Sequence, residues 1–106
     1  MMAIQTTERF RAWFLDLRDV KARARIQARL RNAELGNLSD CAPVGEGVSE
    51  MRIHCGPGYR LYFAQHGPEL IVLLAGGDKS TQAKDIRAAI ALAREARERT
   101  ASSWTT

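Results

Sequence analysis

The chain changes its hydrophobic periodicity twice. Between residues 7 and 35 apolar side chains recur every three or four positions, which indicates amphipathic helices. Between residues 41 and 77 they alternate, with Gly and Pro separating the runs, which indicates strands joined by tight turns. Helical spacing returns in residues 80–99. Because helices and strands are segregated along the chain, the pattern predicts an α+β fold rather than an alternating α/β fold.

The first region predicts a hairpin of two helices within residues 1–36, with Ile4 as a candidate start for a short edge strand ahead of it. Thr6 or Thr7 offers an N-cap for the first helix, and Asp19 offers one for the second. Gly36 is placed to end the second helix. Both helices carry an apolar stripe that should face a core, made by Phe10, Trp13, Phe14 and Leu17 in the first and by Ala22, Ile26, Leu30 and Ala33 in the second.

Residues 41–77 predict a four-stranded, mostly antiparallel sheet. Its strands are expected near Ala42–Val44, Val48–Cys55, Tyr59–Gln65 and Leu70–Ala75. The continuous apolar run of the last strand indicates burial on both faces. A C-terminal helix over 80–99, capped by Ser80 or Thr81, and a frayed tail over 100–106 complete a single domain of 106 residues.

Composition narrows the class of protein further. The formal net charge is +4, and the helical ends carry the excess of basic residues. A basic field favours encounter with a polyanion such as nucleic acid, although arginine-rich helices are also simply well solvated. We expect a cytoplasmic protein with no metal and no cofactor, because the sequence shows no signal peptide, no membrane-spanning run, no CxxC pair and no Cys/His cluster.

The predicted hairpin around residues 56–58 gathers polar side chains on one face. A three-residue loop would place His54 opposite Arg60 and Arg52 opposite Tyr62, on a face exposed to solvent. Two guanidinium groups and an imidazole suit a phosphate, His54 could transfer a proton, and Tyr62 could stack on a base. The alternative is an ordinary polar surface, and a register slip of one residue would scatter the cluster.

The glycine pair Gly76-Gly77 leads from a buried strand toward a helix N-terminus. Such a junction is a natural anion site, but it equally fits a plain structural turn. The segment lacks the spacing of a P-loop.

Three segments carry a resemblance to a known family. They are EMRIH at 50–54, GPGYRLYF at 56–63, and LLAGGDKSTQ at 73–82 followed by KDI at 84–86. With the preceding helix pair, they resemble the RelE/ParE toxin superfamily, and more narrowly its HigB-like "addiction module killer protein" branch. The resemblance extends from about Ile4 to Ala96 and implies a RelE-like (microbial RNase-like) fold.

The resemblance implies the toxin component of a type II toxin–antitoxin system that cleaves mRNA at the ribosome without a metal. Arg60 matches the hairpin arginine of RelE-type members, and Arg52 and His54 occupy positions of basic residues. Lys79 matches an arginine just before the last helix. Some members use a tyrosine in that helix where this chain has Asp85, which leaves His54 or Asp85 as the general acid or base.

The same resemblance leaves two alternatives open. The ParE branch inhibits DNA gyrase without nuclease activity, and an inactive member could serve only as an antitoxin-binding co-repressor module. In every case the expected partner is a small antitoxin, with a helix-turn-helix protein favoured, and the nuclease would also engage the ribosome and mRNA. The residues expected to contact RNA are Tyr62, Lys21, Arg25, Arg29 and Lys84.

Overall fold

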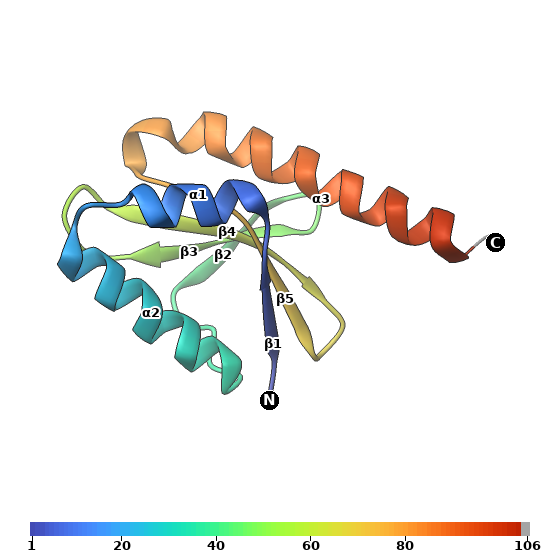
Figure 1. Ribbon diagram of the computed structural model, residues 1–106, viewed down its shortest axis with the longest axis horizontal. Coiled ribbons are helices and arrows are strands. Elements are labelled where there is room, and N and C mark those ends of the chain that lie inside the picture. Colours follow the sequence, from blue (N-terminus) through green and yellow to red (C-terminus); the bar gives the residue numbers. More distant parts are fainter. Residues whose placement is uncertain (105–106) are drawn as a thin grey trace.

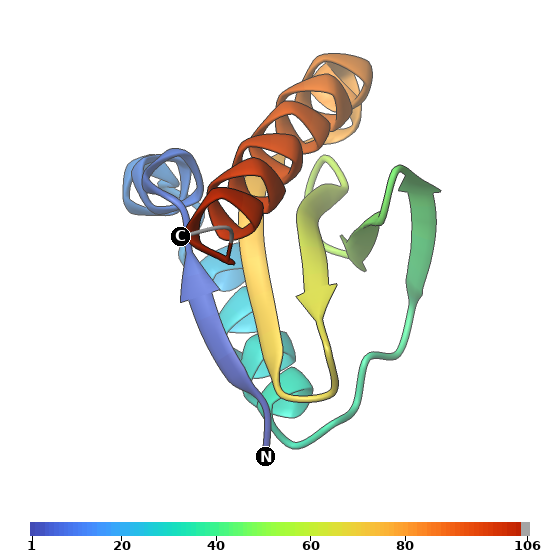
Figure 2. The same cartoon turned by 90° about the vertical axis from the view of Figure 1, so that its right-hand side faces the viewer.

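The computed structural model describes residues 1–104 and arranges them in three layers (Figure 1). A mixed five-stranded sheet has α1 and α2 on one face and α3 on the other, as the rotated view shows (Figure 2). This confirms the α+β class. The elements, in chain order, are β1 (Ala3–Thr6), α1 (Glu8–Asp16), α2 (Val20–Glu34), β2 (Cys41–Gly45), β3 (Val48–Ile53), β4 (Tyr59–His66), β5 (Leu70–Gly77), the 3₁₀ turn η1 (Lys79–Thr81) and α3 (Gln82–Trp104).

The sheet has the strand order β1-β5-β4-β3-β2. The prediction of four strands was wrong by one, because residues 3–6 pair with residues 70–73 of β5 and form a fifth strand. This pair is parallel, whereas β2 to β5 form the expected antiparallel meander. β1 covers the edge of β5, so β5 is an interior strand between β1 and β4, and it is buried on both faces as predicted.

The first core lies between the sheet and the pair α1 and α2. The predicted apolar stripes of both helices face this core. Phe10 of α1 and Ile26 of α2 are buried there against the sheet residues Leu61 and Leu73.

 Thr7 caps α1 by accepting a hydrogen bond from the backbone N–H of Phe10 (3.1 Å), and Asp19 caps α2 through the N–H of Ala22 (3.1 Å). Both helices therefore begin where the sequence indicated. They diverge from the linker at 17–19 instead of packing against each other as a hairpin (Figure 1).

The second core lies under α3, on the opposite face of the sheet. Val48, Tyr62, Ala64 and Leu74 are buried there against the inner side of the helix. The prediction that this face is exposed to solvent was therefore wrong for Tyr62. The face is buried because α3 packs across it. The alternation of apolar and polar residues along one strand cannot reveal such a long-range contact.

The bounds of the last helix also differ from the prediction of 80–99. Asp78 caps the short turn η1, and α3 begins at Gln82 and continues through Trp104. No glycine or proline follows Gly77, so nothing in the sequence ends the helix at residue 99. The tail predicted over 100–106 is thus helical as far as Trp104, and residues 105–106 lie outside the described part of the chain.

The β3–β4 hairpin has a register two residues away from the predicted one. Arg52 pairs with Arg60, and Glu50 pairs with Tyr62, whereas His54 lies beyond the last pair. The cause is a longer turn, in which the N–H of Cys55 binds the carbonyl of Ile53 (2.9 Å). Because side chains alternate with a period of two, the shift preserves the predicted faces but changes which residues are opposite each other.

None of the helices within residues 1–104 has the length and apolar character needed to cross a membrane.

Candidate functional site

The candidate site lies at one end of the molecule, where the linker at 17–19, the β3–β4 turn and the start of α3 come together (Figure 1). Two close approaches fix this arrangement. A Cβ on Gly56 would lie 3.3 Å from the Asp19 carboxylate, and one on Gly58 would lie 4.0 Å from the Lys79 side chain. Both glycines have positive φ, at 54° and 82°, which a turn this tight requires.

Glu50 is the centre of a polar cluster on the face of the sheet toward α3. Its carboxylate accepts a hydrogen bond from Nε of Arg52 (3.2 Å) and another from Nε2 of Gln82 on α3 (3.1 Å), and it lies 3.8 Å from Nε of Arg60. Its side chain is 6% exposed, against 13% for Arg60 and 39% for Arg52. One buried carboxylate therefore holds both arginines side by side and leaves Arg52 the more accessible of the two.

Tyr62 and the Nε atom of Arg60 are buried next to this carboxylate. Neither the Tyr62 hydroxyl nor Arg60 Nε has a hydrogen-bond partner among the residues that the structure describes. Burial, followed by the charges of Glu50 and Asp85, raises the pKa of Tyr62 to about 12. A base cannot stack on this ring in the present structure, because the Tyr62 side chain is fully enclosed.

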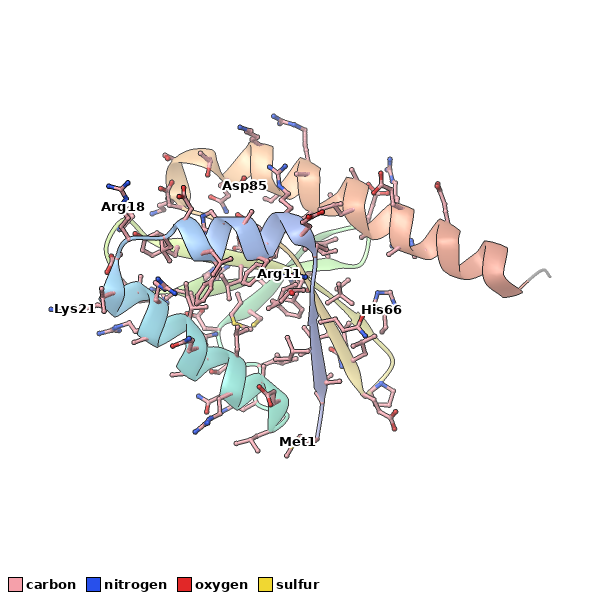
Figure 3. All side chains as sticks on the ribbon, viewed as in Figure 1. Met1, Arg11, Arg18, Lys21, His66 and Asp85 are labelled. Atoms are coloured by element: carbon pink, nitrogen blue, oxygen red, sulfur yellow. The ribbon has the colours of Figure 1, made fainter. Side chains whose placement is uncertain are left out.

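Asp85 is buried in the first turn of α3, above the sheet (Figure 3). It accepts a hydrogen bond from the Thr81 hydroxyl (2.6 Å) and lies 3.9 Å from an Arg9 guanidinium nitrogen. A Cβ on Gly77 would lie 1.9 Å from its carboxylate, so the carboxylate sits directly against the backbone of β5. A glycine is therefore needed at position 77, because any side chain there would occupy the space of the Asp85 carboxylate.

The first glycine of the pair serves the other face of the sheet. A Cβ on Gly76 would lie 2.3 Å from the Trp13 ring of α1. The Gly76-Gly77 pair thus lets a helix approach on each side of β5, and this packing favours its interpretation as a structural junction.

His54 and Arg52 share a second carboxylate, that of Asp40. One Asp40 oxygen bonds Nε2 of His54, and the other lies 3.5 Å from a terminal nitrogen of Arg52. The hydrogen bond with His54 is the main cause that lowers the pKa of Asp40. The His54 side chain is 76% exposed, so it can be reached from solvent.

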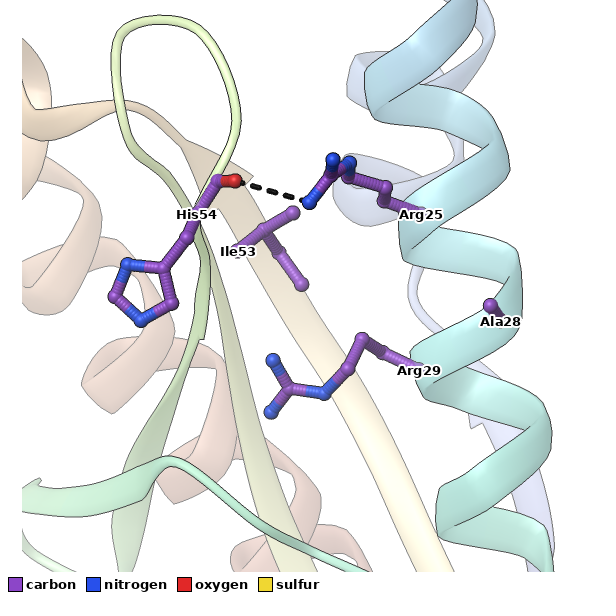
Figure 4. Close-up of a pocket in the computed structure, with 5 residues that line it drawn as sticks. All are labelled: Arg25, Ala28, Arg29, Ile53 and His54. Atoms are coloured by element: carbon purple, nitrogen blue, oxygen red, sulfur yellow. Dashed lines mark hydrogen bonds between the residues drawn. The ribbon is translucent and has the colours of Figure 1, made fainter.

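The cations of α2 reach this end of β3 from the opposite face of the sheet. Arg25 donates to the carbonyl of His54 (3.2 Å), and Arg29 donates to the carbonyls of Arg52 and Ser39. Together with Ala28 and Ile53, these arginines and His54 line a groove of about 240 Å³ (Figure 4). Arg29 therefore has a structural role in addition to any contact with RNA.

The predicted lysines of the site lie at the surface, at the starts of two helices. Lys79 and Lys84 are exposed near the start of α3, and Lys21 points away from the body of the protein at the start of α2 (Figure 3). Hydrogen bonds from the side chain and backbone of Ser80 hold the pKa of Asp78 below its usual value, which fixes the turn that carries Lys79. The structure thus pairs Arg60 with Arg52 and leaves His54 beyond the last residue pair of the hairpin.

Sequence reasoning missed the two carboxylates that organise these cations. Glu50 shares a face with Arg52 and Arg60 by its period-two spacing, so this signal was present in the sequence. Asp40 lies outside the strands, in a loop whose position depends on long-range contacts. Within the described residues, no group of three or more His, Cys, Asp or Glu side chains could hold a metal ion.

Comparison with known proteins gives the chain a family. It is 45% identical over 92 residues to an uncharacterized protein of Haemophilus influenzae strain Rd, and the match covers 87% of this chain and 93% of that protein. The chain belongs to the same family as that protein. No family model matches the chain, and no solved structure matches it.

Proposed function

We propose that this protein is the toxin component of a type II toxin–antitoxin system, a HigB-like member of the RelE/ParE superfamily with a RelE-like (microbial RNase-like) fold, and that it cleaves mRNA on the ribosome. The observation that carries the proposal is the direct pairing of Arg52 with Arg60 on β3 and β4. Two guanidinium groups held side by side at the rim of a sheet suit a phosphodiester. The sequence resemblance supports the same assignment.

The proposed reaction is attack of a ribose 2′-oxygen on the adjacent phosphorus. The 2′-hydroxyl loses its proton to a base, the new P–O bond forms, and the bond to the 5′-oxygen breaks as that oxygen gains a proton. Negative charge accumulates on the phosphoryl oxygens in the transition state, where Arg52 and Arg60 would stabilise it. Lys79 would add a further phosphate contact.

His54 is the stronger of the two candidates for proton transfer. Its side chain is largely exposed, whereas Asp85 is buried and is already bonded to Thr81. A general base must come within hydrogen-bond reach of the proton that it removes, and an exposed imidazole meets this requirement without movement of α3. Asp85 would instead hold the start of α3 against β5.

The proposed RNA path follows the cations around the end of the sheet. Lys84 lies exposed on the α3 side, and Lys21 and Arg25 lie exposed on the α2 side. These side chains would contact the backbone of mRNA and of ribosomal RNA. A cognate antitoxin, expected to be a small helix-turn-helix protein, would inhibit the enzyme by presenting acidic groups to Arg52 or Arg60.

The test is primer extension on mRNA from a translating extract to which purified protein is added. We expect the wild type to cut translated mRNA, and Arg60→Ala to reduce the cleavage rate by about 100-fold or more. Arg52→Ala provides a second variant at a more exposed position, in case loss of Arg60 impairs folding. Arg94→Ala is the matched control, because Arg94 is an exposed arginine on α3 that pairs with Glu46 away from the site. Wild-type cleavage by Arg60→Ala and Arg52→Ala, or no cleavage by the wild type, would refute the nuclease.

One observation favours the alternatives without nuclease activity, which are a gyrase inhibitor and an inactive antitoxin-binding module. Glu50 already neutralises part of the charge of both arginines, and Arg60 is largely covered. An ion-pair cluster of this kind also fits a purely structural role. Loss of DNA supercoiling by gyrase with intact mRNA would support the first alternative, and harmless expression without an antitoxin would support the second.

A further inference from the structure

Asp40 contacts both Arg52 and His54 in the candidate site, although it belongs to none of the strands or helices. The loop that carries it is held by two independent contacts with the rest of the protein. Arg29 binds the carbonyl of Ser39, and the backbone N–H of Arg52 donates to the carbonyl of Asp40 itself (3.1 Å). Asp40 also adopts a φ of 56°, a left-handed conformation that aspartate tolerates better than most residues.

The contact with His54 has a direction set by chemistry. An ionised carboxylate can only accept hydrogen bonds, so the Nε2 atom of His54 must be the donor. Asp40 is ionised at neutral pH, as an aspartate with an ordinary pKa already is, and this bond lowers its pKa further. In the neutral form of the imidazole, this bond puts the proton on Nε2 and leaves Nδ1 with a free lone pair.

The backbone of His54 is fixed from the opposite side. Its carbonyl oxygen faces Arg25, while its imidazole extends from the other side of the strand end (Figure 4). The side chain is therefore held at both ends, by Arg25 through the backbone and by Asp40 through the ring. A side chain that is 76% exposed would otherwise sample several rotamers.

We propose that Asp40 is the positioning residue of His54: it fixes the imidazole tautomer and leaves Nδ1 to accept the proton of the ribose 2′-hydroxyl. This inference rests on the proposed function. Asp40 touches no substrate in this scheme and acts through His54, as a carboxylate does in other carboxylate–histidine pairs. Its second contact, with Arg52, is longer and is duplicated by Glu50.

The test uses the full-length variant Asp40→Gly, because glycine adopts a positive φ without strain and removes the carboxylate completely. Glu46→Gly is the matched control. Glu46 is also an acidic residue with positive φ (49°), and its ion pair is with Arg94, outside the site. Any cost of introducing a flexible glycine should therefore appear in both variants.

The first readout is the tautomer of His54, measured by ¹⁵N NMR of the imidazole nitrogens. The chain has two histidines, so His66 serves as the internal reference. We expect the proton on Nε2 in the wild type and in Glu46→Gly, and a loss of this preference in Asp40→Gly, with His66 unchanged. An unchanged His54 spectrum in Asp40→Gly would overturn the proposal.

The second readout is the single-turnover rate of mRNA cleavage on the ribosome. Asp40→Gly should lower the rate by about 10–100-fold and leave the half-saturating protein concentration nearly unchanged. In a His54→Asn background it should cause no further loss, because Asp40 acts through His54. An equal loss in both backgrounds, or in Glu46→Gly, would overturn the proposal. A wild type that shows the Nε2–H tautomer but cleaves nothing would overturn the proposed function and the catalytic role of the pair, while supporting the pairing itself.

Discussion

Replacement of Gly77 by alanine tests the closest approach in the structure, that of Asp85 to β5. The added Cβ would lie 1.9 Å from an Asp85 carboxylate oxygen and 2.9 Å from the carbon that carries it. Carboxylate and methyl cannot share this space, so Asp85 must move away and lose its hydrogen bond with Thr81. Gly77 does not have positive φ, so the substitution adds no backbone strain of that kind.

The size of the effect follows from three contributions. Overpacking costs about 1–3 kcal/mol, and loss of a charged hydrogen bond costs about 1.5–3 kcal/mol. Replacing a strand glycine by alanine returns about 0.5–1 kcal/mol. We expect a net loss of roughly 2–5 kcal/mol in the free energy of unfolding, which corresponds to a fall in Tm of about 8–20 °C for a domain of this size.

The assay is urea unfolding of four proteins, namely the wild type, Gly77→Ala, Asp85→Ala and the double variant. In the Asp85→Ala background the added methyl meets no carboxylate, so its cost should shrink by about 2 kcal/mol. Gly67→Ala is the control, because its φ is 65° and a Cβ there meets nothing within 4 Å. Its cost should come from the backbone alone and should not depend on Asp85. A neutral Gly77→Ala, or equal costs in both backgrounds, would refute this account of the junction.

Three further predictions concern other parts of the fold. Thr7→Ala should cost about 1–2 kcal/mol of stability in urea unfolding, because the hydroxyl caps Phe10 and also donates to the carbonyl of Leu74 (2.7 Å), and Thr7→Ser should keep most of it. Because the pKa of Tyr62 is raised to about 12, the folded state keeps a proton that the unfolded state loses above about pH 10. The free energy of unfolding should therefore fall by about 1.4 kcal/mol per pH unit between pH 10 and 12. Tyr62→Phe should remove this part of the alkaline loss of stability. The lowered pKa of Asp40 has the opposite effect on stability. The ionised Asp40 stabilises the folded state above the usual aspartate pKa, and this stabilisation disappears as the pH falls through the lowered value. Acid titration followed by circular dichroism should therefore show a smaller acid destabilisation in Asp40→Asn than in the wild type.

Local signals in the sequence predicted the local parts of the fold. The caps Thr7 and Asp19 fix where both N-terminal helices begin, and each depends on residues within three positions. The apolar alternation of β3 and β4 identified the correct faces, because a register error of two residues leaves every side chain on its own side. Arg52 and Arg60 were therefore predicted together, although opposite the wrong partners.

The rest of the candidate site depends on contacts between distant segments. Gln82 reaches Glu50 from α3, across 32 residues of sequence, and Asp40 reaches His54 across 14. The periodicity of a single helix or strand predicts neither contact, because the partners belong to different segments of the chain. Burial of Tyr62 has the same origin, because it results from where α3 crosses the sheet and not from the pattern of β4.

The parallel pairing of β1 with β5 has a consequence for the order of folding. The Thr7 hydroxyl bonds the carbonyl of Leu74, 67 residues further along the chain. On the ribosome, the first strand and the aromatic side of α1 are synthesised long before the strand on which they pack. We therefore expect β1 to stay unpaired until β5 has left the ribosome. The domain should then fold cooperatively after its synthesis, at the slow rate typical of pairings between strands distant in sequence.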